Sequence, residues 1–202
     1  PVGQWMTLPA ALLEVIDAGL EVGRLSGGAF DIASGDLVGA WGFGPRVAGP
    51  DPEAIARLSA SIRLRADQLL ERDVKTGRLR KHAPLSLDLS GIAKGYGVDR
   101  LAETLEAFGI LSYLVSIDGE VRAGRCKPSG QPWRVAVEHP TGGTREASGA
   151  VDLEGAALAT SGDYRHVVEF EGETYAHTMD PRTGRPVDNG VGAVTVRART
   201  CM

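Results

Sequence analysis

The feature that most constrains the fold of this chain is a run of short strand-like segments that follows one long helical pattern. The helical pattern covers about residues 92–108 and stops at Gly109, a residue type that commonly ends helices. The strand-like segments after it are 113–117, 120–123, 133–138, 147–153, 166–170, 174–178 and 191–197. Strands that follow one another without intervening helices favour antiparallel pairing over a doubly wound parallel sheet. The chain is therefore predicted to be an α+β protein.

Two helices and three strands are predicted ahead of the long helix. The first helix is capped by the segment 7–9 and ends near Gly27-Gly28, and the second has the acid-then-proline start of Asp51-Pro52. The period of the sequence then changes to two, which predicts two strands joined by a turn at 75–77 and a third strand over 85–89.

Composition and charge narrow the function classes. The 202 residues are 43% hydrophobic, enough for a real core, and they contain no internal repeat. This length suits one domain or two small lobes that share a core, and a single domain over 1–202 is predicted. Lys and Arg number 22 against 26 for Asp and Glu, a net charge of −4. A mildly acidic chain has no overall electrostatic reason to bind nucleic acid or an anionic membrane. An anionic ligand would need a local site.

The two cysteines, Cys126 and Cys201, exclude some classes of site. They lie far apart and in no CxxC spacing, so they cannot form a zinc site alone or a disulfide framework. A disulfide between them stays open, and so does the redox compartment. No apolar run approaches the roughly 20 residues of a membrane helix.

The segment over 87–99 carries the most informative chemistry. It reads as a strand that ends in small residues and opens into a helix, a junction where backbone N–H groups and the helix dipole favour an anion. Gly91 permits close backbone approach, Lys94 adds a mobile positive charge, and Asp88 can orient a hydroxyl or a ring N–H. A tight turn with a solvated lysine is the simpler interpretation, and the spacing does not fit a phosphate loop of the Walker type.

Two further segments contain functional groups in turn-like surroundings. The sequence Ala-Thr-Ser-Gly-Asp-Tyr-Arg over 159–165 is typical of a turn, or of the hydroxyl-rich edge of a phosphate pocket. His177 precedes the loop 178–186, which holds two arginines and the turn residues Asp, Pro and Gly. A base near neutral pH would be useful beside such a cationic loop. The other histidines, His82, His139 and His166, are interpreted as structural.

No spacing in the chain forms a full metal cage. Mg²⁺ bound to a pyrophosphate needs only a few protein oxygens, because phosphates and waters supply the others. The backbone carbonyl of Gly91 is a candidate ligand of this kind.

Taken in order, these segments resemble the ApbE-type FAD:protein FMN transferases over nearly the whole chain. The strongest matches are 88–99, 160–164 and 180–186, with weaker ones at 28–31, 41–44, 113–117 and 132–135. Each motif alone is weak, and their common order and spacing make the resemblance specific. The resemblance implies an ApbE-like, T-fold-like α+β fold of mixed, largely antiparallel sheets with packed helices.

The resemblance also implies a role for each matching residue. The residues that it assigns to FAD binding are Ala29, Phe30, Asp31, Asp88, Lys94 and Met179. It assigns Gly91 to Mg²⁺ through the carbonyl group, and His177 to activation of the incoming threonine. FAD would be the substrate and Mg²⁺ the cofactor, and the FMN half of FAD would pass to a threonine of an acceptor flavoprotein with release of AMP.

Several departures and alternatives accompany this resemblance. The family's N-terminal FAD-contacting segment would precede Pro1, and its acid-and-threonine motif for Mg²⁺ would follow Met202, so the domain is expected to be incomplete at both ends. Asp118-Gly119 stands where relatives often have Gly-Gly. An FAD pyrophosphatase and a non-catalytic flavin-binding homologue are the alternatives.

The implied location is the bacterial cell envelope, at the periplasmic face of the inner membrane, with any lipid anchor outside this chain. A cytoplasmic location is the alternative.

Overall fold

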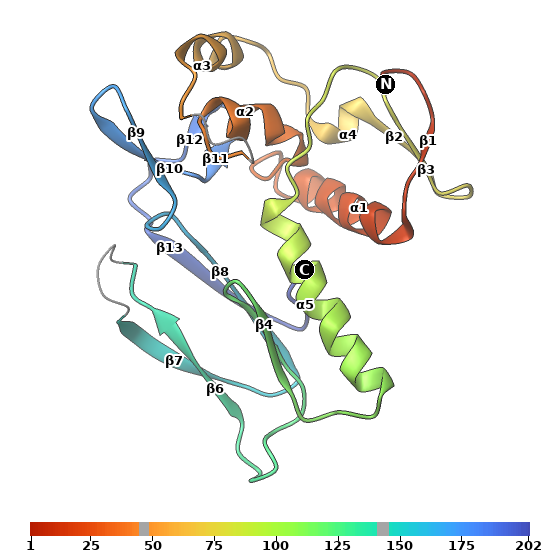
Figure 1. Cartoon of the computed structure of the whole chain (residues 1–202), viewed down its shortest axis with the longest axis vertical. Coiled ribbons are helices and arrows are strands. Elements are labelled where there is room, and N and C mark those ends of the chain that lie inside the picture. The colour runs from red at the N-terminus through yellow and green to blue at the C-terminus, as the bar shows by residue number, and fades with distance from the viewer. Residues whose placement is uncertain (45–48, 141–145) are drawn as a thin grey trace. The chain divides into compact units, whose positions relative to one another are not determined.

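The computed structural model describes residues 1–44, 49–140 and 146–202. The chain forms two units, each with its own core. Unit 1 comprises Pro1–Leu89 and His166–Asn189, and unit 2 comprises Ser90–Arg165 and Gly190–Met202. Figure 1 labels most elements of each unit, all except η1 (Ile32–Ser34) and β5 (Glu120–Ala123). The sequence-based prediction of a single domain over 1–202 stays a prediction.

Unit 1 combines small helices with short antiparallel strands. Its helices are α1 (Ala10–Leu25), the 3₁₀ helix η1 (Ile32–Ser34), α2 (Gly35–Ala40), α3 (Pro52–Ser59) and α4 (Ala66–Leu69). Its strands are β1 (Met6–Thr7), β2 (Leu70–Asp73), β3 (Arg78–Lys81), β9 (Val167–Phe170), β10 (Glu173–Ala176), β11 (Met179–Asp180) and β12 (Arg185–Pro186). The strands β1, β3 and β2 form one sheet in that order, and β9–β10 and β11–β12 form two hairpins.

Helix α1 buries its apolar stripe in the first core of unit 1. Leu13 and Ile16 on this helix are almost fully buried against Ile32. A Cβ at Gly19 would lie 2.7 Å from a methyl group of Ile32, so glycine allows the helix and η1 to pack this closely. The predicted cap at Thr7 is wrong: Thr7 pairs with Arg78 in the β1–β3 ladder, and the helix starts without a side-chain cap.

Other sequence-based expectations for unit 1 have mixed outcomes. Helix α3 begins as predicted, with the Asp51 carboxylate accepting the backbone N–H of Ala54 at 3.0 Å. The hairpin β2–β3 is also confirmed. The predicted third strand over 85–89 is wrong, because this segment pairs with no strand among the described residues. The carbonyl of Ser86 accepts the N–H of Gly35, and Asp88 donates its N–H to the carbonyl of Ile32.

Unit 2 is a helix packed on an antiparallel sheet. Its elements are α5 (Ser90–Ala107), β4 (Leu114–Ile117), β5 (Glu120–Ala123), β6 (Trp133–Glu138), β7 (Ala147–Leu153), β8 (Ala156–Gly162) and β13 (Ala193–Ala198). Four of the strands form a sheet in the order β13-β8-β5-β4, and β6 and β7 form a separate hairpin. Helix α5 packs on β4 and β5, and Figure 1 shows it running beside β4. Apolar side chains of β6 and β7 pack against buried residues of β5 and β8.

The strands of unit 2 were largely predictable, with one omission. Strands β5, β6 and β7 have the predicted bounds. The sequence predicts a turn over 159–165, where the second half of β8 lies. This strand occupies an inner position in the four-stranded sheet. Its sequence of small residues fits a crowded inner strand but lacks the β-branched signature used to recognise strands.

The predicted fold class is confirmed. Both units mix helices with strands, and every ladder between named strands is antiparallel. Within the described residues, no helix is both long and apolar enough to cross a membrane.

Candidate functional site

The predicted site residues fall into two groups, because the boundary between the units lies between Leu89 and Ser90. Gly91 and Lys94 belong to unit 2. The residues of unit 1 are Ala29, Phe30, Asp31, Asp88, His177 and Met179. Each group has a local geometry that can be described by itself.

In unit 2, the start of α5 has the geometry of an anion site. The helix begins at Ser90, which places Gly91 in its first turn and Lys94 just after it. The backbone N–H groups of a first turn, such as those of Gly91 and Ile92, have no acceptor within the helix, and the dipole makes this end positive. The predicted helix start is confirmed, and the roles of Gly91 and Lys94 stay predictions.

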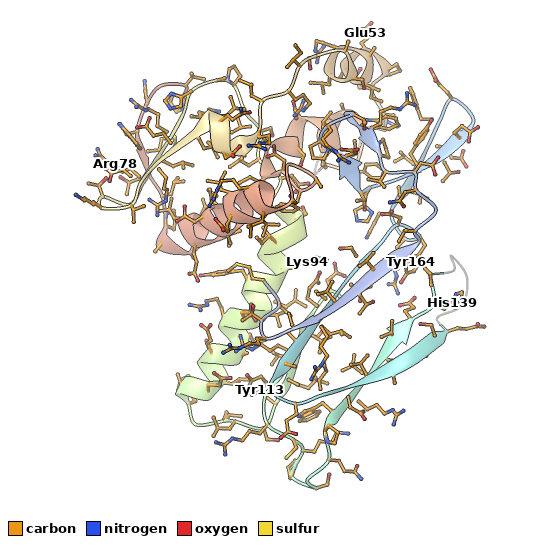
Figure 2. The ribbon with its side chains drawn as sticks, turned by 180° about the vertical axis from the view of Figure 1, so that it is seen from behind. Glu53, Arg78, Lys94, Tyr113, His139 and Tyr164 are labelled. Atoms are coloured by element: carbon orange, nitrogen blue, oxygen red, sulfur yellow. The ribbon has the colours of Figure 1, made fainter. Side chains whose placement is uncertain are left out.

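The charge of Lys94 is paired with two carboxylates, which the sequence-based expectation of a solvated or mobile charge did not include. Its Nζ lies 3.1 Å from Oε1 of Glu120 and 3.4 Å from Oδ2 of Asp118. Figure 2 marks Lys94 near the start of α5, where its side chain points toward the β4–β5 hairpin that carries both acids. Glu120 is not recognisable as a partner of Lys94 from the sequence, because nothing in the local pattern places β5 against α5.

In unit 1, Asp31 and Asp88 lie on neighbouring segments of backbone. Asp88 donates its N–H to the carbonyl of Ile32 at 2.9 Å. The turn that carries Ala29 and Phe30 is fixed by Ser26, whose Oγ accepts the N–H of Phe30 at 3.1 Å. Four of the predicted FAD-binding residues, Ala29, Phe30, Asp31 and Asp88, thus lie on two neighbouring segments of unit 1.

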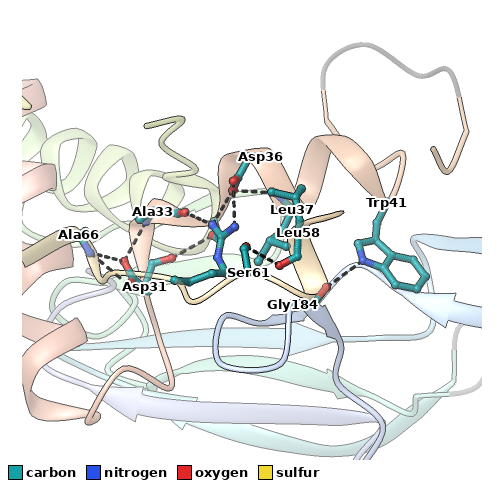
Figure 3. A network of polar contacts seen from close by, with 11 residues as sticks. Asp31, Ala33, Asp36, Leu37, Trp41, Leu58, Ser61, Ala66 and Gly184 are labelled. Carbon is teal, nitrogen blue, oxygen red and sulfur yellow. Dashed lines mark hydrogen bonds and ion pairs between the residues drawn. The ribbon is translucent and has the colours of Figure 1, made fainter. Parts of the chain in front are cut away.

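The carboxylate of Asp31 already has a structural task. It accepts the N–H of Ala33 at 2.9 Å and that of Ala66 at 3.1 Å, and Asp31 is 9% exposed (Figure 3). Arg63 strengthens the same segment, because its guanidinium donates to the carbonyl of Ala33 at 2.8 Å and to the carboxylate of Asp36. Asp31 therefore holds the 31–37 segment in place, whatever it contributes to a ligand.

The loop after His177 is tied to an aromatic cluster. The indole of Trp41 is fully buried and donates to the carbonyl of Gly184 at 3.1 Å (Figure 3). Its ring packs against Phe170 and Tyr175 at centroid distances of 5.5 and 4.8 Å. Met179, predicted to meet the flavin through its backbone, packs at the edge of this cluster. The cluster fixes the loop that follows the candidate base.

His177 stands beside two aromatic rings. Its ring centroid lies 6.2 Å from that of Phe43 and 5.4 Å from that of His166, both edge to face. His166, interpreted from the sequence as structural, thus lies next to the candidate base. The register of the β9–β10 hairpin pairs Val167 with Ala176, so the next residues outward on the two strands are His166 and His177. The proximity of His166 and His177 could therefore be predicted from the hairpin pattern in the sequence.

The loop 180–186 is less cationic than its sequence indicates. Arg182 forms a two-point ion pair with Asp180, at 2.9 and 3.1 Å. The Arg182 guanidinium holds the pKa of the Asp180 carboxyl below its ordinary value. One of the two arginines is therefore neutralised within the loop.

The segment 159–165 is partly strand, not turn. Thr160 lies in β8, where its Oγ1 is 2.9 Å from Oγ1 of Thr195 on β13. A Cβ at Gly162 would lie 2.6 Å from the Tyr164 ring, so glycine is required where the strand ends. The hydroxyls of this segment are used at least in part within the sheet.

The described residues do not fit a Mg²⁺ site by themselves. In the ranges 1–44, 49–140 and 146–202, no three His, Cys, Asp or Glu side chains form a metal-binding group. The carbonyl of Gly91 is a single neutral oxygen, whereas Mg²⁺ takes six oxygen ligands and favours carboxylates among its protein ligands. No chemical step can be assigned to Mg²⁺ from these residues.

The sequence model of the ApbE family matches residues 2–202. This chain belongs to the ApbE family. The resemblance noted from its motifs is therefore confirmed at the level of the family.

Curated relatives and solved structures agree with this membership. The chain is 38% identical over 198 residues to a protein of Klebsiella pneumoniae and 40% identical over 191 residues to one of Vibrio cholerae, both named FAD:protein FMN transferase. These alignments cover 95% and 94% of this ApbE-family chain but only 56% and 57% of the relatives. The chain thus spans little more than half the length of the curated relatives it matches.

Solved structures of the family share the fold. A crystal structure of the Pseudomonas stutzeri flavinyl transferase ApbE, in its apo form, gives a TM-score of 0.81 at 40% identity and covers all of this chain and 62% of its own. A structure of the ApbE protein from Thermotoga maritima gives 0.86 at 30% identity, covering 99% of this chain and 64% of its own.

Proposed function

We propose that the full-length protein transfers FMN from FAD to a threonine of an acceptor flavoprotein, with Mg²⁺, and releases AMP. The observation that carries the proposal is the match of the whole chain to the ApbE family, together with relatives of up to 40% identity named FAD:protein FMN transferase. The chain spans little more than half of those relatives, so the activity is proposed for the full-length protein and not for this segment alone.

The start of α5 is proposed to bind the pyrophosphate of FAD. Its first-turn N–H groups and the positive end of the helix dipole suit a phosphate, and the Lys94 ammonium, although paired with Glu120 and Asp118, adds a cation nearby. Phosphoryl-type transfer depends mainly on positioning and on stabilising negative charge, which these groups can supply.

His177 is proposed to accept the proton of the acceptor threonine. The threonine oxygen forms a new bond to the FMN-side phosphorus, the bond from that phosphorus to the bridging oxygen breaks, and AMP leaves with the bridging oxygen. The hydroxyl proton passes to the imidazole of His177 as the oxygen attacks. The ring has Phe43 and His166 for neighbours, and the Trp41 cluster fixes the loop behind it.

Mg²⁺ would supply charge neutralisation at the pyrophosphate when bound. Among the residues of this chain, the Gly91 carbonyl is the proposed ligand. The side-chain ligands are proposed to lie in the acid-and-threonine motif that the family resemblance places after Met202.

The test is the intact mass of an acceptor domain after incubation with the full-length protein, FAD and Mg²⁺. We expect a gain of one FMN that is lost when the acceptor threonine is changed to valine and when EDTA is added. Free FMN and AMP with an unmodified acceptor would instead identify an FAD pyrophosphatase, in which water replaces the threonine. FAD that stays intact would contradict both and leave a flavin-binding protein.

A bacterial envelope location, at the periplasmic face of the inner membrane, is also proposed. It rests on the family resemblance. Fractionation of cells that express the full-length protein tests it. Recovery in the membrane or periplasmic fraction is expected, and recovery in the cytosol alone would contradict it.

A further inference from the structure

The ammonium of Lys94 faces two carboxylates that differ sharply in exposure. The Glu120 side chain is 12% exposed and its Oε1 lies 3.1 Å from Nζ. The Asp118 side chain is 79% exposed and its nearer oxygen lies 3.4 Å away. Water and salt screen an exposed pair, whereas a nearly buried pair keeps most of its attraction. Glu120 is therefore the dominant partner of Lys94.

The backbone fixes Glu120 in this position. Residues Ile117 and Glu120 pair across the β4–β5 hairpin, and the two residues between them, Asp118 and Gly119, have φ values of 46° and 103°. Positive φ at both central residues is the requirement of the tight turns that match strand twist, so the register of the hairpin is set. A Cβ at Gly97 would lie 3.1 Å from the Ile117 side chain, which shows how closely α5 meets the end of β4.

The second carboxylate oxygen of Glu120 shows that the charge of Glu120 depends on Lys94. Among the described residues, Oε2 of Glu120 is buried and has no hydrogen-bond partner. A nearly buried carboxylate needs a cation, and within the described part of the chain Lys94 is the only one in ion-pair range of Glu120. The pair is thus mutually dependent. Glu120 restrains a side chain that would otherwise sample many rotamers.

We infer that Glu120 is a positioning residue for the reaction, because it holds the Lys94 ammonium in one orientation toward the pyrophosphate of FAD. The inference rests on the proposed function, which assigns the pyrophosphate to this end of α5. A negative charge beside an anion site weakens ground-state binding, so its benefit has to appear in the chemical step. Glu120 is expected to raise kcat and to leave the KM for FAD unchanged or slightly higher.

The test compares Glu120→Gln with Asp118→Asn in the full-length protein, with saturating acceptor and varied FAD. Both substitutions remove one charge and keep the size of the side chain. We expect Glu120→Gln to lower kcat about tenfold without raising KM, and Asp118→Asn to stay within about twofold of wild type in both. Glu120→Asp, which keeps the charge on a shorter stem, should give an intermediate kcat and provides a second variant should Glu120→Gln unfold.

A double-mutant cycle separates positioning from general stability. If Glu120 acts through Lys94, Glu120→Gln has no further effect on kcat in a Lys94→Met background. Unchanged kcat in Glu120→Gln, equal losses in the Glu120 and Asp118 variants, or a full additional loss in the Lys94→Met background would overturn the inference while wild type stays active. Wild type that transfers no FMN would overturn the proposed function, and the inference with it.

Discussion

The carboxylate of Asp99 accepts the backbone N–H of Cys201 at 3.0 Å, although 102 positions separate the two residues in the sequence. It also accepts the N–H of Met202 at 2.9 Å and the guanidinium of Arg122 at 2.9 Å. One buried acid on α5 therefore anchors the backbone after β13 and an arginine on β5.

Replacing Asp99 with asparagine should destabilise unit 2 substantially. The amide keeps one acceptor oxygen but points a donor at groups that also donate, and it removes the countercharge of Arg122, whose side chain is only 16% exposed. Breaking a buried pair of this kind costs about 3–5 kcal/mol. Urea unfolding, followed by a probe in unit 2, measures the loss.

A matched control for Asp99→Asn is Asp17→Asn, with unfolding followed by a probe in unit 1, to which Asp17 belongs. Asp17 also pairs with an arginine, Arg72, but its side chain is 44% exposed. Its loss should stay below about 1 kcal/mol. Equal losses for the two variants would contradict the anchoring role of Asp99.

Gly95 is required because the backbone of Cys201 approaches α5 there. A Cβ at Gly95 would lie 2.5 Å from the Cys201 carbonyl oxygen and 2.9 Å from the Met202 nitrogen. Alanine normally stabilises a helix relative to glycine by about 1 kcal/mol, but here the overlap should reverse the sign and cost about 1–3 kcal/mol. The free energy of unfolding of Gly95→Ala tests this.

Gly39 provides the comparison for Gly95. It is also helical, in α2, and a Cβ there would meet nothing within 4 Å. Gly39→Ala should therefore leave the protein as stable as wild type or more so. A stabilising effect of alanine at both positions would show that α5 and the Cys201 backbone do not meet as described.

The thiol of Cys201 should be unreactive in the folded protein. Burial, helped by the nearby carboxylates of Asp99 and Glu120, raises its pKa from the ordinary 9.0 to about 11. At pH 8 the thiolate fraction should therefore be roughly 100-fold lower than in the unfolded chain. Alkylation with iodoacetamide, read by peptide mapping with and without urea, gives the ratio. Equal rates in the two conditions would contradict it.

The ion pair of Asp180 and Arg182 should contribute a small, pH-dependent stability. Because the pKa of Asp180 is lowered in the folded state, the contribution is complete above its ordinary value of 3.8 and is lost as the pH falls through the lowered value. Arg182→Leu should thus destabilise the protein slightly at pH 7, and less at pH 3. Urea unfolding at both pH values makes the comparison. If Arg182→Leu lowered the free energy of unfolding equally at pH 7 and pH 3, the role of the ion pair would be contradicted.

The sequence predicted elements whose signals are local. Strands β6 and β7 alternate in polarity and include several valines, and Asp51 caps α3 with a side chain three residues from its partner. Strand β8 was not predicted. Its residues are small because strands lie on both sides of it, and nothing in the sequence of β8 alone indicates that crowding.

In the candidate site too, local features were predictable from the sequence and contacts between distant segments were not. The helix start that carries Gly91 and Lys94 was predictable from its glycines and from the helical period that follows. The pairing of Lys94 with Glu120 was not, because it depends on the packing of α5 against β4 and β5 and on the turn at Asp118. The structural use of Asp31 likewise depends on Ala66, 35 residues away in the sequence.

The most direct test of the proposed FMN transfer is a single turnover of the full-length protein with Mg²⁺, limiting FAD and an excess of acceptor. The AMP released and the FMN bound covalently to the acceptor are quantified at the same time points. If the protein is an FMN transferase, both appear at the same rate, with one acceptor-bound FMN for each AMP. AMP that accumulates with free FMN, or FAD that remains intact, would contradict it.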